Sequence, residues 1–122
     1  MQLHRERSDQ INIIRSMDDE HIIVGEQKFT VPCIVTVSEI VSWKPISAEQ
    51  LSVSDFAAAI DQSPELILLG TGMSLVIPNP GLITAINDAG VGFEFMDNAA
   101  ACRTYNVLAH EGRAVAVALL AG

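Results

Sequence analysis

A short apolar run that ends in two closely spaced glycines constrains the fold of this chain most. Four consecutive apolar residues, 66–69, follow Ser63-Pro64-Glu65 and lead into Gly70-Thr71-Gly72. An uninterrupted apolar run of this length predicts a strand that is buried on both faces. Gly70 and Gly72 can adopt backbone conformations closed to other residues and let another group approach the main chain. Open α/β sheets usually form a binding crevice where such a strand ends.

Around this run, the spacing of the apolar residues alternates between the spacing typical of helices and the spacing typical of strands. Helix caps are expected at Ser52 or Ser54, at Asn79, which Pro80 follows, and at Asp97 or Asn98. The expected helices cover residues 52–62, 81–89 and 99–110, and the expected strands cover 65–70, 92–96 and 115–120. This order predicts a parallel or mostly parallel sheet that is covered by helices.

The first third of the chain is rich in short strands instead. The expected strands cover residues 11–14, 21–24, 28–31 and 33–37. Gly25-Glu26 predicts a tight hairpin between the second and third of them, and Pro32 predicts a bend or an edge position. No linker divides this β-rich half from the rest, so residues 1–122 are expected to form one α/β domain. Residues 71–79 are expected to form a loop, in which the apolar residues 75–77 form a short extra strand or cover the core.

The charge balance excludes one class of partner. The net charge is −8 and the pI is near 4.6, with seven basic residues spread thinly along the chain. A nucleic-acid surface would need clustered Lys and Arg, so nucleic-acid binding is not expected. An acidic surface keeps a protein soluble and is compatible with a basic protein partner.

The two cysteines and the lack of targeting signals point to the cytoplasm. Cys33 and Cys102 are far apart in the sequence, match no metal-ligand spacing and are expected to be reduced thiols. The charged segment 1–10 lacks the apolar core of a signal peptide, and no apolar run is long enough to span a membrane. No metal and no cofactor is expected.

One candidate site follows from the expected sheet. If strands 65–70 and 92–96 are parallel, the Gly70-Thr71-Gly72 turn lies near Asn98 at the start of the last helix. Backbone N–H groups and the helix dipole can hold a small anion there, and Arg103 adds a positive charge. The candidate ligand-binding residues are therefore Gly70, Thr71, Gly72, Asn98 and Arg103. The alternative is that the glycines only serve the turn, since the negative charge of Asp97 opposes an anion.

No arrangement of residues predicts catalysis. The Gly70-Thr71-Gly72 turn lacks the third glycine of a dinucleotide fingerprint and the Lys of a P-loop. Cys102 and His110 lie two turns apart on one helix, which is too far for a direct hydrogen bond. Tyr105 and Asn106, with Glu111 and Arg113 beyond them, form a polar cluster. Such groups usually fix a helix end or join an ion pair, and protein contact is their next expected use.

Four segments together resemble the Mth-type domain family, which includes mitochondrial complex I assembly factor 3. They are Leu68-Leu69-Gly70-Thr71-Gly72, the stretch 90–97, the stretch 100–108 that contains Ala-Cys-Arg-Thr-Tyr-Asn, and Glu111-Gly112-Arg113. The resemblance implies a bacterial member with a three-layer α/β fold around a mixed central sheet. It also implies that no enzymatic activity is established for the family and that one eukaryotic branch assists complex I assembly through protein contacts. Asn98 stands where the family typically has Thr.

Two functions of different classes follow. The first is a non-enzymatic interaction or assembly protein of the cytoplasm with a protein partner, which the resemblance and the missing catalytic residues favour. The alternative is a binder of a small molecule or anion, or an enzyme, that uses the crevice beside Gly70-Thr71-Gly72, Asn98 and Arg103. Thermal stabilisation by a ligand distinguishes the second from the first.

Overall fold

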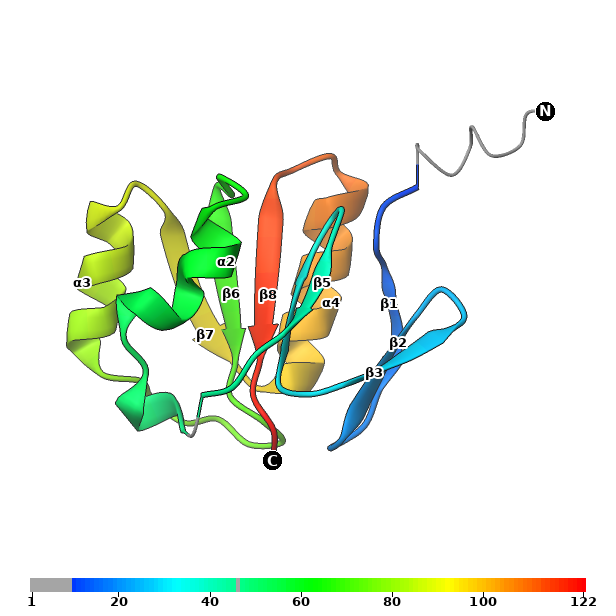
Figure 1. Ribbon diagram of the computed structural model, residues 1–122, viewed down its shortest axis with the longest axis horizontal. Helices are drawn as coiled ribbons and strands as arrows, with labels where there is room; N and C mark the ends of the chain where they lie inside the picture. Colours follow the sequence, from blue (N-terminus) through cyan, green and yellow to red (C-terminus); the bar gives the residue numbers. More distant parts are fainter. Residues whose placement is uncertain (1–9, 46) are drawn as a thin grey trace.

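The computed structural model describes residues 10–45 and 47–122. Our expectation that residues 1–10 contain no signal peptide concerns a segment that lies almost entirely outside the described residues. Ile46 also lies outside them. The described residues form a small antiparallel sheet, a larger mixed sheet and a set of helices, arranged as shown in Figure 1.

The larger sheet has five strands in the order β5-β4-β8-β6-β7. Their bounds are β4 Cys33–Thr36, β5 Ile40–Ser42, β6 Leu66–Gly70, β7 Gly92–Met96 and β8 Val115–Leu119. β6 is parallel to both β7 and β8, whereas β4 is antiparallel to β8 and to β5. The sheet is therefore mixed, and the apolar run 66–69 forms a strand flanked on both sides, as its sequence predicts.

Helices cover both faces of this sheet and make a three-layer arrangement (Figure 1). One face packs against the long helix α4, Asn98–His110, through side chains such as Leu68 and Val117. The other face packs against η1 (Ala48–Gln50), η2 (Val53–Phe56), α2 (Ala57–Ile60) and α3 (Pro80–Asp88). Ile67 and Leu69 enter this second core, because successive side chains of a strand point to opposite faces.

A smaller antiparallel sheet of three strands lies beside α4. It contains β1 Ile14–Met17, β2 His21–Val24 and β3 Gln27–Thr30, in that order. Gly25 has a φ of +62° in the β2–β3 turn, which confirms the predicted hairpin. Ile14, Ile22 and Val24 are buried against α4 in the same core as Leu68.

Three local predictions are wrong. The first strand starts at Ile14 and not at Ile11, because the N–H of Asn12 donates to the carbonyl of Val37 at the end of β4. Pro32 marks the bend between the two sheets, as one of our alternatives states, but β4 lies inside the larger sheet and not at its edge. The helix expected over 52–62 is divided into η2 and α2, with Ser52 in a capping box.

The third error concerns the apolar residues after β6. No strand forms at 75–77, and the side chains of Leu75 and Ile77 are exposed. Only Val76 is partly buried against the core. The segment lies in the loop 71–79, which runs from β6 to α3 as the sequence predicts.

Candidate functional site

The predicted crevice lies where β6 ends and α4 begins. The side chain of Asn98, which is only 2% exposed, is inserted between the turn and the end of β8. Its Oδ1 accepts a hydrogen bond of 3.0 Å from the N–H of Gly72, and its Nδ2 donates at 2.8 Å to the carbonyl of Leu120. The backbone N–H of Asn98 also donates to the carbonyl of Gly72, at 2.8 Å. The parallel strands therefore bring the turn and Asn98 together as predicted, and three hydrogen bonds join them to each other and to Leu120.

The two glycines of this turn are needed for different reasons. A Cβ atom on Gly70 would overlap Oδ1 of Asn98 and a methyl group of Leu119. Gly72 has a φ of +102°, a conformation that side chains disfavour, and its Cα faces the backbone of residues 121 and 122. We call this interlocked group, Gly70, Gly72 and Asn98, the Asn98 latch.

Thr71 organises the loop that follows the latch. Its hydroxyl donates to the carbonyl of Ser74 at 2.7 Å and accepts from the N–H of Val76 at 3.0 Å. The backbone N–H of Thr71 donates to the carbonyl of Met96 on β7. The hydroxyl and the backbone N–H of Thr71 are thus both engaged within the fold.

The amides predicted to hold an anion already have partners. The N–H of Gly72 is bound by Asn98, and the carboxylate of Asp97 accepts from the N–H of Ala100 as the N-cap of α4. Arg103 is exposed and follows Asn98 by five residues, which places it about 140° around the helix axis. Four of the five candidate residues therefore cluster, while Arg103 points in another direction. Ligand binding at this turn stays a prediction.

The Ala-Cys-Arg-Thr-Tyr-Asn run of α4, residues 101–106, has a structural role that the sequence did not reveal. The buried Tyr105 donates from its hydroxyl to the carbonyl of Asn12 at 2.7 Å. The Asn106 amide binds both backbone groups of Ile14, accepting from its N–H at 2.9 Å and donating to its carbonyl at 2.8 Å. The Asn106 amide thus makes the two hydrogen bonds to β1 that the backbone of a neighbouring strand would make. Burial raises the pKa of the Tyr105 hydroxyl, which stays neutral and serves as a donor.

Arg113, another member of the predicted polar cluster, lies apart from this contact. Arg113 pairs with Glu65 at 3.2 Å, and both side chains are about half exposed. His110 is exposed, and its Nδ1 lies 3.0 Å from the carbonyl of Asn106. The expected ion pair is confirmed, and a partly exposed pair of this kind contributes little to stability.

Both cysteines are buried thiols. Cys33 and Cys102 are free, and burial raises the pKa of each to about 12. The two side chains share one core, and the charge that Cys33 would carry adds to the rise at Cys102. A thiol that stays protonated at neutral pH is a poor nucleophile. Within the described residues, no group of three or more His, Cys, Asp or Glu is placed to hold a metal ion.

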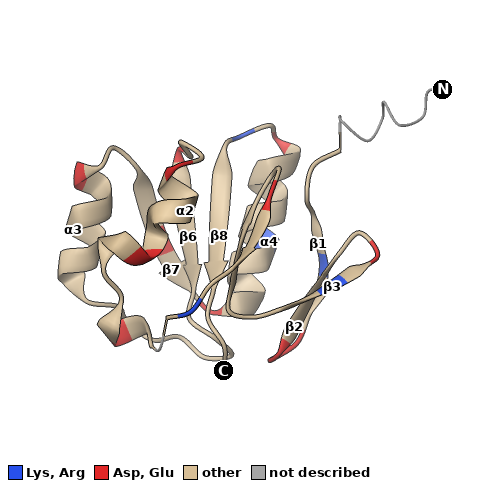
Figure 2. Ribbon diagram, viewed as in Figure 1, with Lys and Arg blue, Asp and Glu red and all other residues tan. Residues whose placement is uncertain are grey.

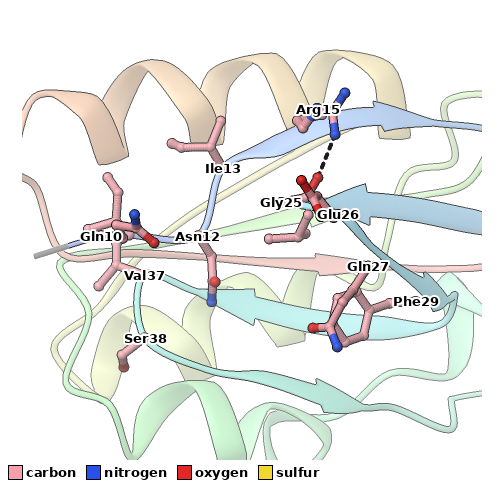
Figure 3. A pocket seen from close by; sticks show the side chains of 12 residues that line it. Gln10, Asn12, Ile13, Arg15, Gly25, Glu26, Gln27, Phe29, Val37 and Ser38 are labelled. Carbon is pink, nitrogen blue, oxygen red and sulfur yellow. Dashed lines mark hydrogen bonds between the residues drawn. The ribbon is translucent and has the colours of Figure 1, made fainter. Parts of the chain in front are cut away.

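A groove of about 860 Å³ lies elsewhere, between the chain before β1, the β2–β3 turn and the end of β4 (Figure 3). Its wall combines apolar side chains such as Ile13 and Phe29 with polar ones such as Asn12 and Gln27. The guanidinium of Arg15 closes one end by donating to the carbonyl of Gly25 at 2.6 Å, as Figure 3 shows. Sequence reasoning missed this groove because three separate segments form it.

The fold places the molecule among three-layer proteins described as Mth938-like domains. A Bordetella pertussis structure described in these words is 28% identical, with a TM-score of 0.78 over 98% of this chain and 92% of that one. A Bordetella parapertussis structure is 33% identical, with a TM-score of 0.84 over 93% and 98% of the two chains. These likenesses confirm the predicted fold class.

The family follows from the sequence match. Residues 14–120 match the model of a family described as "Protein of unknown function (DUF498/DUF598)", and the chain belongs to this family. Mouse NADH dehydrogenase [ubiquinone] 1 alpha subcomplex assembly factor 3 is 29% identical over 80% of this chain. A Francisella tularensis protein named "13 kDa major membrane protein" is also 29% identical, over 80% of this chain and 79% of its own length. This chain covers only 54% of the mouse protein.

Proposed function

We propose that this protein is a non-enzymatic interaction or assembly factor that acts through contacts with other proteins. The observation that carries the proposal is the similarity to an assembly factor of NADH dehydrogenase over four fifths of this chain. Because the chain spans about half of that relative, the proposal concerns the function of the shared region alone.

The geometry of the predicted site supports the same proposal. Asn98, Tyr105 and Asn106 are three polar side chains of α4, and each is bound to the backbone of another segment. Their hydrogen bonds hold the fold together and leave the outer surface as the part that meets other molecules. We propose the cytoplasm as the location, since two free, buried thiols suit a reducing compartment. Within the described residues, no helix is both long and apolar enough to cross a membrane.

Affinity purification of the tagged full chain from its own host, in low salt, tests the proposal. We expect a stoichiometric protein partner, identified by mass spectrometry, and the loss or slower formation of one complex after deletion of the gene. Subunits of NADH dehydrogenase are the first candidates to look for. The proposal is wrong if no partner copurifies and every complex of the deletion strain is intact.

A further inference from the structure

The loop between β6 and α3 presents three large apolar side chains to solvent. Met73, Leu75 and Ile77 are 52%, 58% and 69% exposed, and they alternate with Val76 and Pro78, which face the core. Single exposed apolar residues are common on protein surfaces, but three within five residues form a local patch. We call Met73, Leu75 and Ile77 the apolar loop patch.

The patch is held away from the core by the residues around it. The Thr71 hydroxyl bridges the carbonyl of Ser74 and the N–H of Val76, and the Asn98 latch fixes Gly72 just before the patch. Pro78, which is fully buried, fixes the chain just after it. The three side chains cannot turn inward without breaking these contacts. A surface that is already ordered loses little conformational entropy when a partner binds it.

The sequence on either side of the patch carries only acidic charge. The stretch 45–102 contains the patch and has seven Asp and Glu residues but no Lys, Arg or His. Figure 2 shows an acidic position on α3 and no basic position on α2, α3, β6 or β7. Lys44 directly precedes the stretch, and Arg103 directly follows it. A partner that covers the patch therefore approaches a segment with acidic flanking sequence in a chain of net charge −8, and complementary charge favours a basic surface.

We propose that the apolar loop patch is the anchor for a protein partner that offers an apolar pocket bordered by Lys and Arg. This inference rests on the proposed function and names the surface that performs it. A second copy of this chain would bring the same net charge of −8, so like charges oppose self-association through this patch. An anionic membrane is opposed for the same reason.

The test compares a double variant with a matched control in the full chain. Leu75→Ser/Ile77→Ser removes two exposed apolar side chains, and Val107→Ser removes another, 57% exposed on α4, outside the patch. Each tagged protein is purified from its own host in low salt, and recovery of the identified partner is measured. In a parallel experiment, a photo-crosslinking residue at position 77 identifies the surface that it touches. Thermal unfolding checks that all variants fold.

The inference predicts that the double variant recovers roughly tenfold less partner than the wild type, while Val107→Ser recovers it normally. The crosslinked peptide of the partner contains Lys or Arg, and added salt weakens the complex. Full recovery by the folded double variant overturns the inference and leaves the proposed function standing. Crosslinking mainly to a second copy, or binding of the wild type to phosphatidylglycerol vesicles that the double variant loses, also overturns it. If even the wild type recovers no partner and every complex of the deletion strain is intact, the proposed function fails and takes the inference with it.

Discussion

Two neighbouring segments at one edge of the sheet use their residues in opposite ways. In the Asn98 latch, the polar groups of Gly72 and Asn98 bind each other, and the space beside Gly70 is filled. In the apolar loop patch, only a few residues later, Met73, Leu75 and Ile77 face solvent. The latch thus stabilises the fold, whereas the patch is free to contact another molecule. A conspicuous glycine motif can mark the segment that positions a functional surface instead of the surface itself.

The largest effect is expected from Gly70→Ala. The new Cβ would overlap Oδ1 of Asn98, and neither the strand nor the buried amide can move away easily. We expect a loss of at least about 3 kcal/mol in the free energy of unfolding, measured by urea denaturation. Gly81→Ala is the control, because Gly81 is exposed in the first turn of α3 and its new Cβ would meet only the side chain of Asn79. Equal stability of Gly70→Ala and wild type would show that the latch is not tightly packed.

Asn98→Ala should have the next largest effect. The substitution leaves the N–H of Gly72 and the carbonyl of Leu120 without their buried partner. We expect a loss of about 2 to 3 kcal/mol in the same assay. Asn87→Ala, an exposed asparagine on α3, should be nearly neutral. If the two alanine variants unfold at the same urea concentration, Asn98 does not hold the turn.

Thr71→Val tests the connection between the two segments. Valine nearly keeps the shape of threonine but cannot bind the carbonyl of Ser74 or the N–H of Val76. We expect a modest loss of about 1 kcal/mol in stability and faster hydrogen exchange at the Val76 amide. The patch keeps its residues but loses its fixed shape, so partner recovery should also fall. Unchanged exchange at Val76 would contradict the role assigned to the hydroxyl.

Leu75→Ser/Ile77→Ser should affect stability least. Both side chains are mostly in solvent already, so their removal should change the free energy of unfolding by no more than about 0.5 kcal/mol. Thermal and urea unfolding measure this directly. A loss comparable to that of Asn98→Ala would mean that the patch belongs to the core, and the contrast between the two segments would disappear.

The sequence predicts the second half of the chain well because strong local signals agree there. The apolar run 66–69 can only be buried, Asn79-Pro80 starts a helix, and Gly90 and Gly112 end two of them. The start of β1 is less predictable, because contacts with α4 and β4 decide it and both lie far away in the sequence. Apolar content alone could not show that the side chains of Leu75 and Ile77 face outward.

The candidate site is also predictable only in part. The parallel connection of β6 and β7 predicts that the Gly70-Thr71-Gly72 turn lies beside Asn98, and the structure places them together. The direction of the Asn98 side chain depends on the end of β8, which is distant in the sequence. Sequence reasoning therefore placed the turn beside Asn98 but could not tell whether their polar groups are free. Likewise, it noticed Tyr105 and Asn106 without finding their partners on the N-terminal segment.

Amide hydrogen exchange at Gly72, followed by NMR, tests the central claim most directly. If Asn98 holds this N–H inside the fold, the amide exchanges slowly in the free protein, and inorganic phosphate changes neither its rate nor its chemical shift. Exchange as fast as at an unprotected loop amide, or protection that appears only when phosphate is added, would contradict the account. The turn would then be a binding site that a ligand completes.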